Sequence, residues 1–419
     1  MPWSYTDQPE AIHTRLIRVV VRSIAHAGPA WIVVGASLAL SLLGIYAIDV
    51  AERVPQASAL VNVTASGRLI GPTALRQAIY LLVGIVTCVI VALPHYRTLG
   101  PWTWALYGAG LALLVFLIVP GVPSFLVRPR GGARAWIDLG PLNLQPSELV
   151  KVGTVLVLAW YLRYRKNHRT FKGLLPPAIL TGVPVGLIML QPDLGTAILF
   201  IPALFFVLIA AGAKLKHLVL VVALATMAAP AAYPLLKPHQ KARIVGLVQQ
   251  IRGDNSEDLD INMQSVTAQR LIGAGGIVGV GDEHARALQR FNALPERHND
   301  MVFSPVVTRF GLIGGLLLLL LFALWGIGAF LTAATSPEPF GRLICVGAVG
   351  FLFAQVVVNV GMNLGLLPII GITLPFVSHG GSSMIAQWAM VGLVLSVGLR
   401  RQGYELQRSF EWSDRGDDL

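Results

Sequence analysis

The sequence predicts an all-α, polytopic membrane protein with about ten transmembrane helices. Of its 419 residues, 55% are hydrophobic and only 13% are charged, whereas about a quarter of the residues in an ordinary soluble domain are charged. Several stretches of about twenty residues carry almost no charge, and a helix of about that length crosses roughly 30 Å of hydrocarbon. The composition therefore excludes an ordinary soluble fold.

Ten apolar segments have the length of membrane-spanning helices. They cover residues 30–50, 74–93, 102–120, 147–163, 173–191, 195–212, 218–236, 303–334, 341–366 and 376–399. One large extracellular loop, 237–302, is expected between the seventh and eighth helices, and a structureless connection of this length is often functional. We accordingly divide the chain into a cytoplasmic N-terminal segment 1–29, a transmembrane domain 30–400 and a cytoplasmic C-terminal tail 401–419.

The distribution of Lys and Arg predicts the orientation of the chain. An even number of spans puts both termini on one side, and that side holds the excess of basic residues once the long loop is set aside. Both termini are therefore expected in the cytoplasm. The net charge of +11 reflects this bias and not nucleic-acid binding. Residues 12–26 alternate apolar and basic side chains at helical spacing, which predicts a helix on the inner membrane surface, with a solvated basic tail as the alternative.

Charged residues within an apolar span are costly and therefore informative. The fourth span opens with Gln145, Ser147, Glu148 and Lys151. Glu148 and Lys151 are three residues apart, so they lie on one helical face and can pair. Either they form an ion pair that holds helices together, or they line a polar pocket in which the ammonium group meets a phosphate.

Turn-rich strings precede two of the spans. In the first, Arg134 can clamp a phosphate through its forked guanidinium or simply cap the loop, and Trp136 is an aromatic residue suited to the membrane interface. In the second, Gln191 and Asp193 form a tight turn in which Asp193 is expected to cap the next helix. The residue types alone leave these alternatives open.

The last two spans also carry polar groups. Gln355, Asn359 and Asn363 recur at intervals of four in the ninth span, a stripe that hydrogen bonds between helices would explain. The tenth span begins with a Gly- and Ser-rich string whose free backbone N–H groups form either a helix cap or an anion site. That string is Ser378, His379, Gly380, Gly381, Ser382 and Ser383.

A carboxylate stands where the long loop enters the eighth span. Asp300, beside His298 and Arg297, is either a general base or a solvated loop acid. The glycine run 273–281 lacks the spacing of a dinucleotide-binding fingerprint. The acidic stretch 254–260 lacks the spacing of an EF-hand loop, so we interpret it as solvated loop.

These motifs converge under the expected topology. All except the stripe in the ninth span fall on the external face, although some 250 residues of chain separate them. Unrelated structural features would be spread over both faces, so a shared outward-facing site is the better interpretation. Its basic groups and helix N-terminus favour a phosphorylated ligand that resides in the membrane.

The strings also resemble a known family, the RodA/FtsW/SpoVE (SEDS) family of bacterial cell-wall proteins, over about residues 30–400. The motifs that carry the resemblance are Gly-Ala-Arg-x-Trp-Ile-x-Leu-Gly, Gln-Pro-Ser-Glu-x-x-Lys, Gln-Pro-Asp-Leu-Gly-Thr, Pro-Glu-Arg-His-x-Asp and Leu-Pro-Phe-Val-Ser-x-Gly-Gly-Ser-Ser, in that order. The 295–298 and 366–378 strings are more similar to RodA than to FtsW.

The resemblance implies an inverting peptidoglycan glycosyltransferase of the bacterial cytoplasmic membrane, acting on lipid II at its outer face for cell elongation. A septal, FtsW-like polymerase is the alternative within the family. It implies a class B penicillin-binding protein, lipid II and membrane lipids as partners, and a divalent cation, Mg²⁺ or Mn²⁺, is a candidate cofactor with unassigned ligands. Asp300 corresponds to the essential loop aspartate, Glu148 and Lys151 to the membrane pair, and Arg134 to the loop arginine.

Other polar residues of these motifs complete the predicted binding site. The expected substrate-binding residues are Arg134, Trp136, Gln145, Ser147, Glu148, Lys151, Gln191, Asp193, His298, Asn359, Ser378, His379, Gly380, Gly381, Ser382 and Ser383. The chain departs from the family pattern at Asn299, Met301, Thr308-Arg309 and His379. At Arg309 a positive charge replaces a negative one close to the predicted catalytic loop. A lipid-precursor flippase and a non-catalytic scaffold for a transpeptidase are rival functions.

Overall fold

The structure is a computed structural model, and it describes most of the chain between residues 27 and 400. The described ranges are 27–52, 71–120, 122–123, 125–127, 133–138, 140, 143–235, 238–252, 262–292 and 294–400. The predicted interfacial helix over 12–26, the acidic stretch 254–260 and the tail 401–419 lie outside the described residues.

Each of the ten predicted spans contains one helix, which confirms a multi-pass membrane protein. The ten helices are α2 (Ala30–Glu52), α3 (Pro72–Ala92), α5 (Thr103–Ile118), α6 (Pro146–Leu162), α7 (Leu175–Leu190), α8 (Leu194–Ala210), α9 (Leu215–Ala232), α13 (Phe303–Thr335), α14 (Pro339–Asn363) and α15 (Gly381–Leu399). Proline stands in the first turn of α3, α6 and α14, where its fixed φ favours the helix and its missing N–H costs nothing.

The length and hydropathy of these helices match those of membrane spans. Six helical segments in the described part of the chain are long and apolar enough to cross a membrane, and α5, α8 and most of α9 are shorter apolar helices. Many of their large apolar side chains point outward, such as Leu82 at 63% exposure and Ile90 at 62%. Such surfaces suit contact with lipid rather than water.

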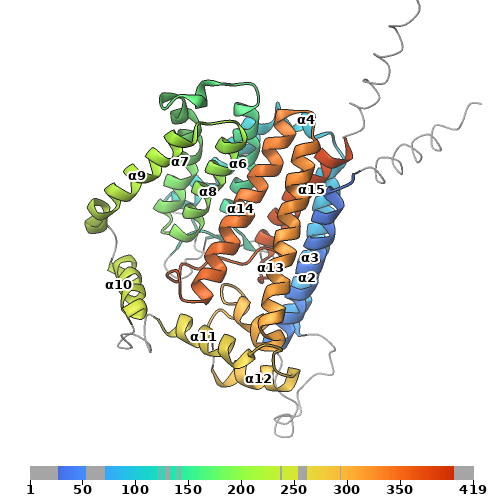
Figure 1. Cartoon of the computed structure of the whole chain (residues 1–419), viewed down its shortest axis with the longest axis vertical. Helices are drawn as coiled ribbons and strands as arrows, with labels where there is room; N and C mark the ends of the chain where they lie inside the picture. The colour runs from blue at the N-terminus through green and yellow to red at the C-terminus, as the bar shows by residue number, and fades with distance from the viewer. Residues whose placement is uncertain are drawn as a thin grey trace, which may run out of the picture.

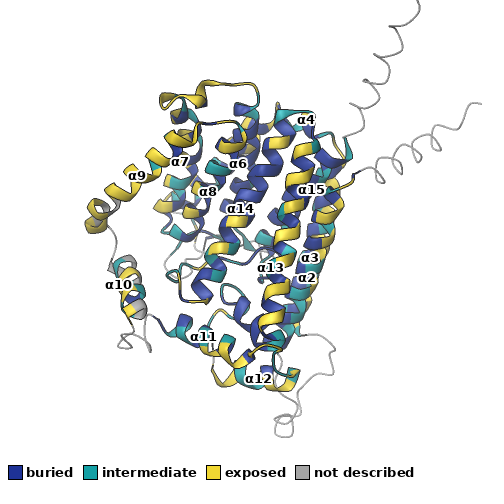
Figure 2. Cartoon of the chain, viewed as in Figure 1, coloured by how far each residue is buried: buried dark blue, intermediate teal, exposed yellow. Residues whose placement is uncertain are grey.

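Helices α14 and α15 form the interior of the bundle, because most of their residues are buried, and the burial of α14 is visible in Figure 2. α14 packs against α6, α8 and α13, whereas α15 packs most extensively against α3. The α3–α15 approach is close because a Cβ on Gly392 would lie 2.7 Å from the Cys88 carbonyl oxygen. Small residues at such crossings are typical of helix packing in membranes.

The long segment 237–302 is not a structureless connection, and that expectation was wrong. Its described residues form α10 (Pro238–Arg252), α11 (Met263–Gly275) and α12 (Asp282–Phe291). These helices lie at one end of the bundle in Figure 1, and α11 and α12 both contact α13. The remaining short elements are α4 (Tyr96–Leu99), the 3₁₀ turns η2 (Asn167–Arg169), η3 (Lys172–Leu174) and η4 (Tyr233–Leu235), and the strands β1 (Ile137–Asp138) and β2 (Asn143–Leu144).

The tenth span begins five residues later than predicted. Residues 364–380 are non-helical, and α15 begins only at Gly381. Phe376 has a φ of 64°, a conformation that a bulky residue adopts only under constraint. In addition, the Ser378 hydroxyl accepts the Leu374 N–H at 2.7 Å, which replaces a helical bond by a local turn.

Candidate functional site

The predicted motifs meet at one end of the bundle, the end that also holds α10, α11 and α12. The Ser382 hydroxyl accepts the Gln145 N–H at 3.0 Å, which joins the start of α15 to the start of α6. The Gln145 amide nitrogen in turn lies 3.4 Å from the Asp193 carboxylate at the start of α8. The Ser378 hydroxyl donates to the Asn299 carbonyl in the loop before α13. The predicted convergence of these motifs is therefore confirmed.

Glu148 and Lys151 form a buried ion pair. Lys151 Nζ donates to Glu148 Oε1 at 2.8 Å, and the two residues are only 1% and 4% exposed. The pairing predicted from their spacing is thus confirmed. The second carboxylate oxygen, Glu148 Oε2, and the neighbouring Ser147 hydroxyl are buried and have no hydrogen-bond partner within the described chain. A buried acceptor without a partner is costly, so this oxygen is available to a ligand.

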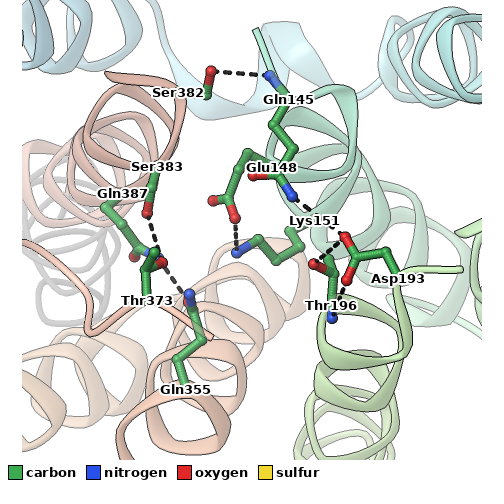
Figure 3. A network of polar contacts seen from close by, with 10 residues as sticks. All are labelled: Gln145, Glu148, Lys151, Asp193, Thr196, Gln355, Thr373, Ser382, Ser383 and Gln387. Carbon is green, nitrogen blue, oxygen red and sulfur yellow. Dashed lines mark hydrogen bonds and ion pairs between the residues drawn. The ribbon is translucent and has the colours of Figure 1, made fainter. Parts of the chain in front are cut away.

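Further polar side chains surround this pair, as Figure 3 shows. The Gln387 amide donates to the Gln355 side-chain oxygen at 2.7 Å, and the Thr373 and Ser383 hydroxyls lie 3.5 Å apart. We call the whole set the polar cluster. It consists of Gln145, Glu148, Lys151, Asp193, Thr196, Gln355, Thr373, Ser382, Ser383 and Gln387.

The turn before α8 caps that helix, as its residue types predicted. Asp193 is the N-cap of α8 and accepts the Thr196 N–H at 3.0 Å and the Thr196 hydroxyl at 2.8 Å. Gln191 is buried and donates to the Leu114 carbonyl at 2.9 Å. The capping interpretation of Asp193 is confirmed, whereas substrate binding by either residue stays a prediction.

Backbone contacts hold the loop that carries Asp300. The Asn359 side chain donates to the Asp300 carbonyl at 2.7 Å and to the Ile372 carbonyl at 2.7 Å. Asn363 also donates to the Asp300 carbonyl, at 3.1 Å. The Asn359 amide thus holds both the Asp300 loop and the 364–380 segment, and substrate binding by Asn359 stays a prediction.

The Asp300 carboxylate lies over the backbone of the 364–380 segment. A Cβ placed on Gly371 would come within 3.3 Å of Asp300 Oδ2, and Gly371 itself has a φ of 71°. The neighbouring residue His298 accepts the His379 N–H through its carbonyl at 2.8 Å. Three consecutive residues, 298 to 300, are therefore fixed through their main-chain carbonyls against α14 and the segment before α15.

Two histidines belong to this site, one in the loop and one in the segment before α15, and burial lowers the pKa of both. Burial lowers the pKa of His298 to about 4, and the positive charge of Arg297 adds to this effect. Burial also lowers the pKa of His379, as does the charge of Arg76. The His379 ring lies 5.8 Å from the Tyr80 ring. The Nδ1 atoms of both histidines are buried without a hydrogen-bond partner in the described part of the protein.

The start of α15 offers backbone N–H groups. No side chain caps this helix within the described chain, and Ser378 and Ser382 direct their hydroxyls to other carbonyls. This favours the anion-site interpretation over simple capping. Gln77, which the sequence analysis missed, holds the segment in place, because its side chain donates to the Ser378 carbonyl and accepts the Gly380 N–H. A glutamine in the first turns of an apolar span was the available signal.

Arg134 and Trp136 belong to the short hairpin at the same end. They precede β1, which pairs with β2, and the Asn143 carbonyl in β2 accepts the Ser382 hydroxyl. Arg134 is half-buried, and its Nε has no hydrogen-bond partner within the described residues. A guanidinium of this kind is suited to an anion.

The described residues do not fit a ready-made metal site. Among them, no group of three or more His, Cys, Asp or Glu side chains is arranged to hold a metal ion. Lys151 already occupies one oxygen of Glu148. The divalent cation therefore stays a prediction without assigned ligands in the described part of the chain.

The fold and this site define a multi-pass membrane protein whose polar sequence motifs form one site at the end of a helical bundle. A family model described as "Cell cycle protein", that of FtsW, RodA and SpoVE, matches residues 31–403. The chain belongs to this family.

Its relatives span different members of the family. Stage V sporulation protein E of Bacillus subtilis is 31% identical over 77% of this chain and 86% of its own length. Peptidoglycan glycosyltransferase MrdB of Escherichia coli K12 is 33% identical over 82% of this chain and 90% of its own. A probable peptidoglycan glycosyltransferase FtsW of Pseudomonas fluorescens is 30% identical over 77% of this chain and 78% of its own.

Solved structures have the same fold. A chain from a study of the coordination of polymerization and crosslinking by a peptidoglycan synthase complex is 34% identical, with a TM-score of 0.71, over 89% of this chain and 98% of that one. The rod shape determining protein RodA of Thermus thermophilus is 31% identical, with a TM-score of 0.62, over 89% of this chain and 97% of that one.

Proposed function

We propose that this protein is a peptidoglycan glycosyltransferase that polymerises lipid II, with Asp300 as its general base. Family membership and the relatives named peptidoglycan glycosyltransferase support the activity. One structural observation carries the assignment of the site. The Asp300 loop, the polar cluster and the uncapped start of α15 are joined by hydrogen bonds at one end of the bundle.

The chemistry follows from a membrane-bound donor that is already activated. Asp300 accepts the proton from the 4-hydroxyl of the acceptor sugar as that oxygen bonds to the anomeric carbon of the donor. The bond from this carbon to the diphosphate oxygen breaks, the anomeric centre inverts, and undecaprenyl diphosphate leaves with the electron pair. General base assistance typically contributes about 10²- to 10⁴-fold to such a step.

The leaving diphosphate needs positive charge and N–H donors. Lys151, Arg134 and the backbone N–H groups at the start of α15 supply these in the proposed site. Burial and the charge of Arg297 lower the pKa of His298 to about 4, so its imidazole adds no positive charge beside Asp300 near pH 7.

We also propose the orientation and the partner of this site. Both termini lie in the cytoplasm and Asp300 on the outer side, as the excess of Lys and Arg between the spans indicates. A class B penicillin-binding protein supplies the crosslinking reaction, which is consistent with the similarity to a chain from a peptidoglycan synthase complex. The 295–298 and 366–378 strings favour a role in elongation over a septal one.

The test uses purified full-length protein and labelled lipid II in detergent. Wild type is expected to form glycan chains, and Asp300→Asn is expected to remain folded but to lose at least 10²-fold in rate. Glu283→Gln is the matched control, because Glu283 is an exposed acid of the same extramembrane region. Translocation of lipid II across vesicles without chain formation would indicate the flippase, and neither activity would indicate the scaffold. Wild-type polymerisation by Asp300→Asn would refute the role of this carboxylate.

A further inference from the structure

Arg309, one of the positions at which the chain departs from the family pattern, belongs to a three-residue charge cluster with Asp282 and Tyr46. Arg309 Nε donates to Asp282 Oδ1 in a short ion pair, and it lies 3.3 Å from the Tyr46 hydroxyl. That hydroxyl donates to the same carboxylate oxygen at 2.8 Å. The acidic partner for this arginine is therefore supplied by the extramembrane segment itself.

The charge cluster joins three elements that are far apart in the sequence. Tyr46 is on α2, Asp282 is the first residue of α12, and Arg309 is on α13 two residues before Gly311, whose φ of 68° breaks the helix. Arg309 Nη1 also donates to the Val280 carbonyl at 3.3 Å. One guanidinium thus fixes the start of α12 and the turn that leads into it.

Backbone hydrogen bonds beside the charge cluster hold the turn before α12 against the kink in α13. The Val280 N–H donates to the Thr308 carbonyl at 3.1 Å, and the Leu312 N–H donates to the Gly276 carbonyl at 2.9 Å. A Cβ on Gly279 would lie only 2.2 Å from the Arg309 carbonyl oxygen. The two chain segments therefore lie in direct contact at the point where the Arg309 side chain reaches Asp282.

The other end of α12 contacts the loop that carries Asp300. Arg297 Nη1 donates to the Gln289 carbonyl in the last turn of α12, at 3.1 Å. The Gln289 amide lies 3.5 Å from the Thr308 hydroxyl, directly before Arg309. Helix α12 therefore runs as a strap from the charge cluster to a residue three positions from Asp300.

We propose that Arg309 is a positioning residue for the catalytic loop, acting with Asp282 and Tyr46 through α12; this proposal rests on the proposed function. An acidic residue at 309 would repel the Asp282 carboxylate and release the start of α12. In this chain the arginine and Asp282 act as a matched pair, so the reversed charge at 309 fits an active enzyme.

The effect on the reaction follows from geometry and not from contact with substrate. A displacement of a catalytic group by about 1 Å can cost on the order of 10²-fold in rate. Arg309→Glu and Asp282→Arg are each expected to lower kcat by about 10- to 100-fold with little change in KM. The exchanged double variant Asp282→Arg/Arg309→Asp restores the opposite charges and is expected to recover most of the activity.

The experiment combines two readouts on the full-length protein in detergent. One is the rate of lipid II polymerisation, and the other is hydrogen–deuterium exchange of the peptide spanning residues 294–302. Each single variant should increase exchange in this peptide, and the exchanged variant should return it to the wild-type level. Glu283→Arg is the matched control, because it reverses a charge one residue away whose ion pair with Arg286 is 58% exposed on the Glu283 side; it should change neither readout.

The outcomes separate this proposal from the proposed function. Unchanged exchange and unchanged kcat in Arg309→Glu would overturn the strap, as would failure of the exchanged variant to recover either readout. If wild type formed no glycan, the proposed function would fail, but the exchange data would still test whether the charge cluster holds the loop. Arg309→Lys keeps the charge without the forked geometry and should give an intermediate increase in exchange.

Discussion

Breaking the Glu148–Lys151 ion pair is expected to separate its structural role from its chemical one. The two residues are 4% and 1% exposed and share one 2.8 Å bond. Removing one partner of a buried ion pair leaves an uncompensated charge and typically lowers the free energy of unfolding by about 3–5 kcal/mol. Glu148→Gln should therefore lower the free energy of unfolding by about 3–5 kcal/mol.

The double variant Glu148→Gln/Lys151→Met removes both charges. Replacing a buried ion pair by uncharged side chains of similar size is often neutral for stability, so this variant should unfold close to wild type. It should nevertheless polymerise lipid II at least 10²-fold more slowly, because the ammonium group that meets the leaving diphosphate is gone.

Thermal unfolding in detergent and a polymerisation assay on the same preparations check both effects. A loss of 3–5 kcal/mol corresponds to a fall in Tm of roughly 3–6 °C in a chain of this size. Glu283→Gln, which breaks an exposed ion pair, should shift Tm by no more than about 1 °C. Wild-type polymerisation by the double variant would show that the pair is purely structural, and an unchanged Tm in Glu148→Gln would show that the carboxylate is not needed to compensate Lys151.

Three further predictions concern the Asp300 loop. Asn359→Ala leaves the Ile372 carbonyl without its donor and Asp300 with only one, so we expect a loss of about 1–3 kcal/mol in stability and a lower kcat, measured by thermal unfolding and lipid II turnover. Gly371→Ala should act similarly, at about 1–3 kcal/mol, because its φ of 71° strains alanine and its Cβ would crowd Asp300 Oδ2. The free energy of unfolding should also fall by about 1–2 kcal/mol between pH 7.5 and pH 5.0, because burial lowers the pKa of His298 to about 4 while the unfolded imidazole takes up a proton near pH 6.5. His298→Gln should flatten this pH dependence. An equally steep fall in that variant would exclude His298 as its source.

The membrane-spanning helices could be predicted because long runs of apolar residues identify them. Twenty apolar residues can satisfy their backbone only as a helix in lipid, so a helix lies in each predicted span. The start of the tenth span was not predictable in the same way. The run 376–399 is apolar throughout its beginning, yet the φ of 64° at Phe376 and the Ser378 hydroxyl bond to Leu374 depend on tertiary packing.

The helices of the long segment 237–302 were missed for a different reason. Segment 237–302 is polar overall, and its net charge is balanced, so it resembles a solvated loop when taken as one piece. In α12, however, the apolar residues Ala285 and Leu288 are three residues apart on one face and are buried or partly buried, a helical spacing that a shorter window would have detected. Asp282 and Glu283 in its first turn are also suited to a helix N-terminus.

In the candidate site, contacts between residues close in sequence could be predicted, and contacts between distant residues could not. Glu148 and Lys151 could be paired from their spacing, and Asp193 could be identified as a cap, because both relations are local in sequence. The contacts that place Asp300 are not local and are made to main-chain carbonyls, by Asn359 at a separation of 59 residues and by Ser378 at 79. A carbonyl leaves no trace in the residue type that carries it, so no motif marks these bonds.

Arg309 looks unfavourable in the sequence because its partner is also distant along the chain. Taken residue by residue, a positive charge in place of a negative one near the proposed catalytic carboxylate disturbs the local electrostatics. In the structure the compensating acid, Asp282, lies 27 residues away in the sequence and bonds to it directly. Partial burial raises the pKa of Asp282, but the hydrogen bonds from Tyr46 and Arg309 outweigh this and lower it overall. Asp282 therefore stays ionised as the pH falls toward its lowered pKa, and the charge cluster should persist throughout the neutral range in which the wild-type enzyme is tested.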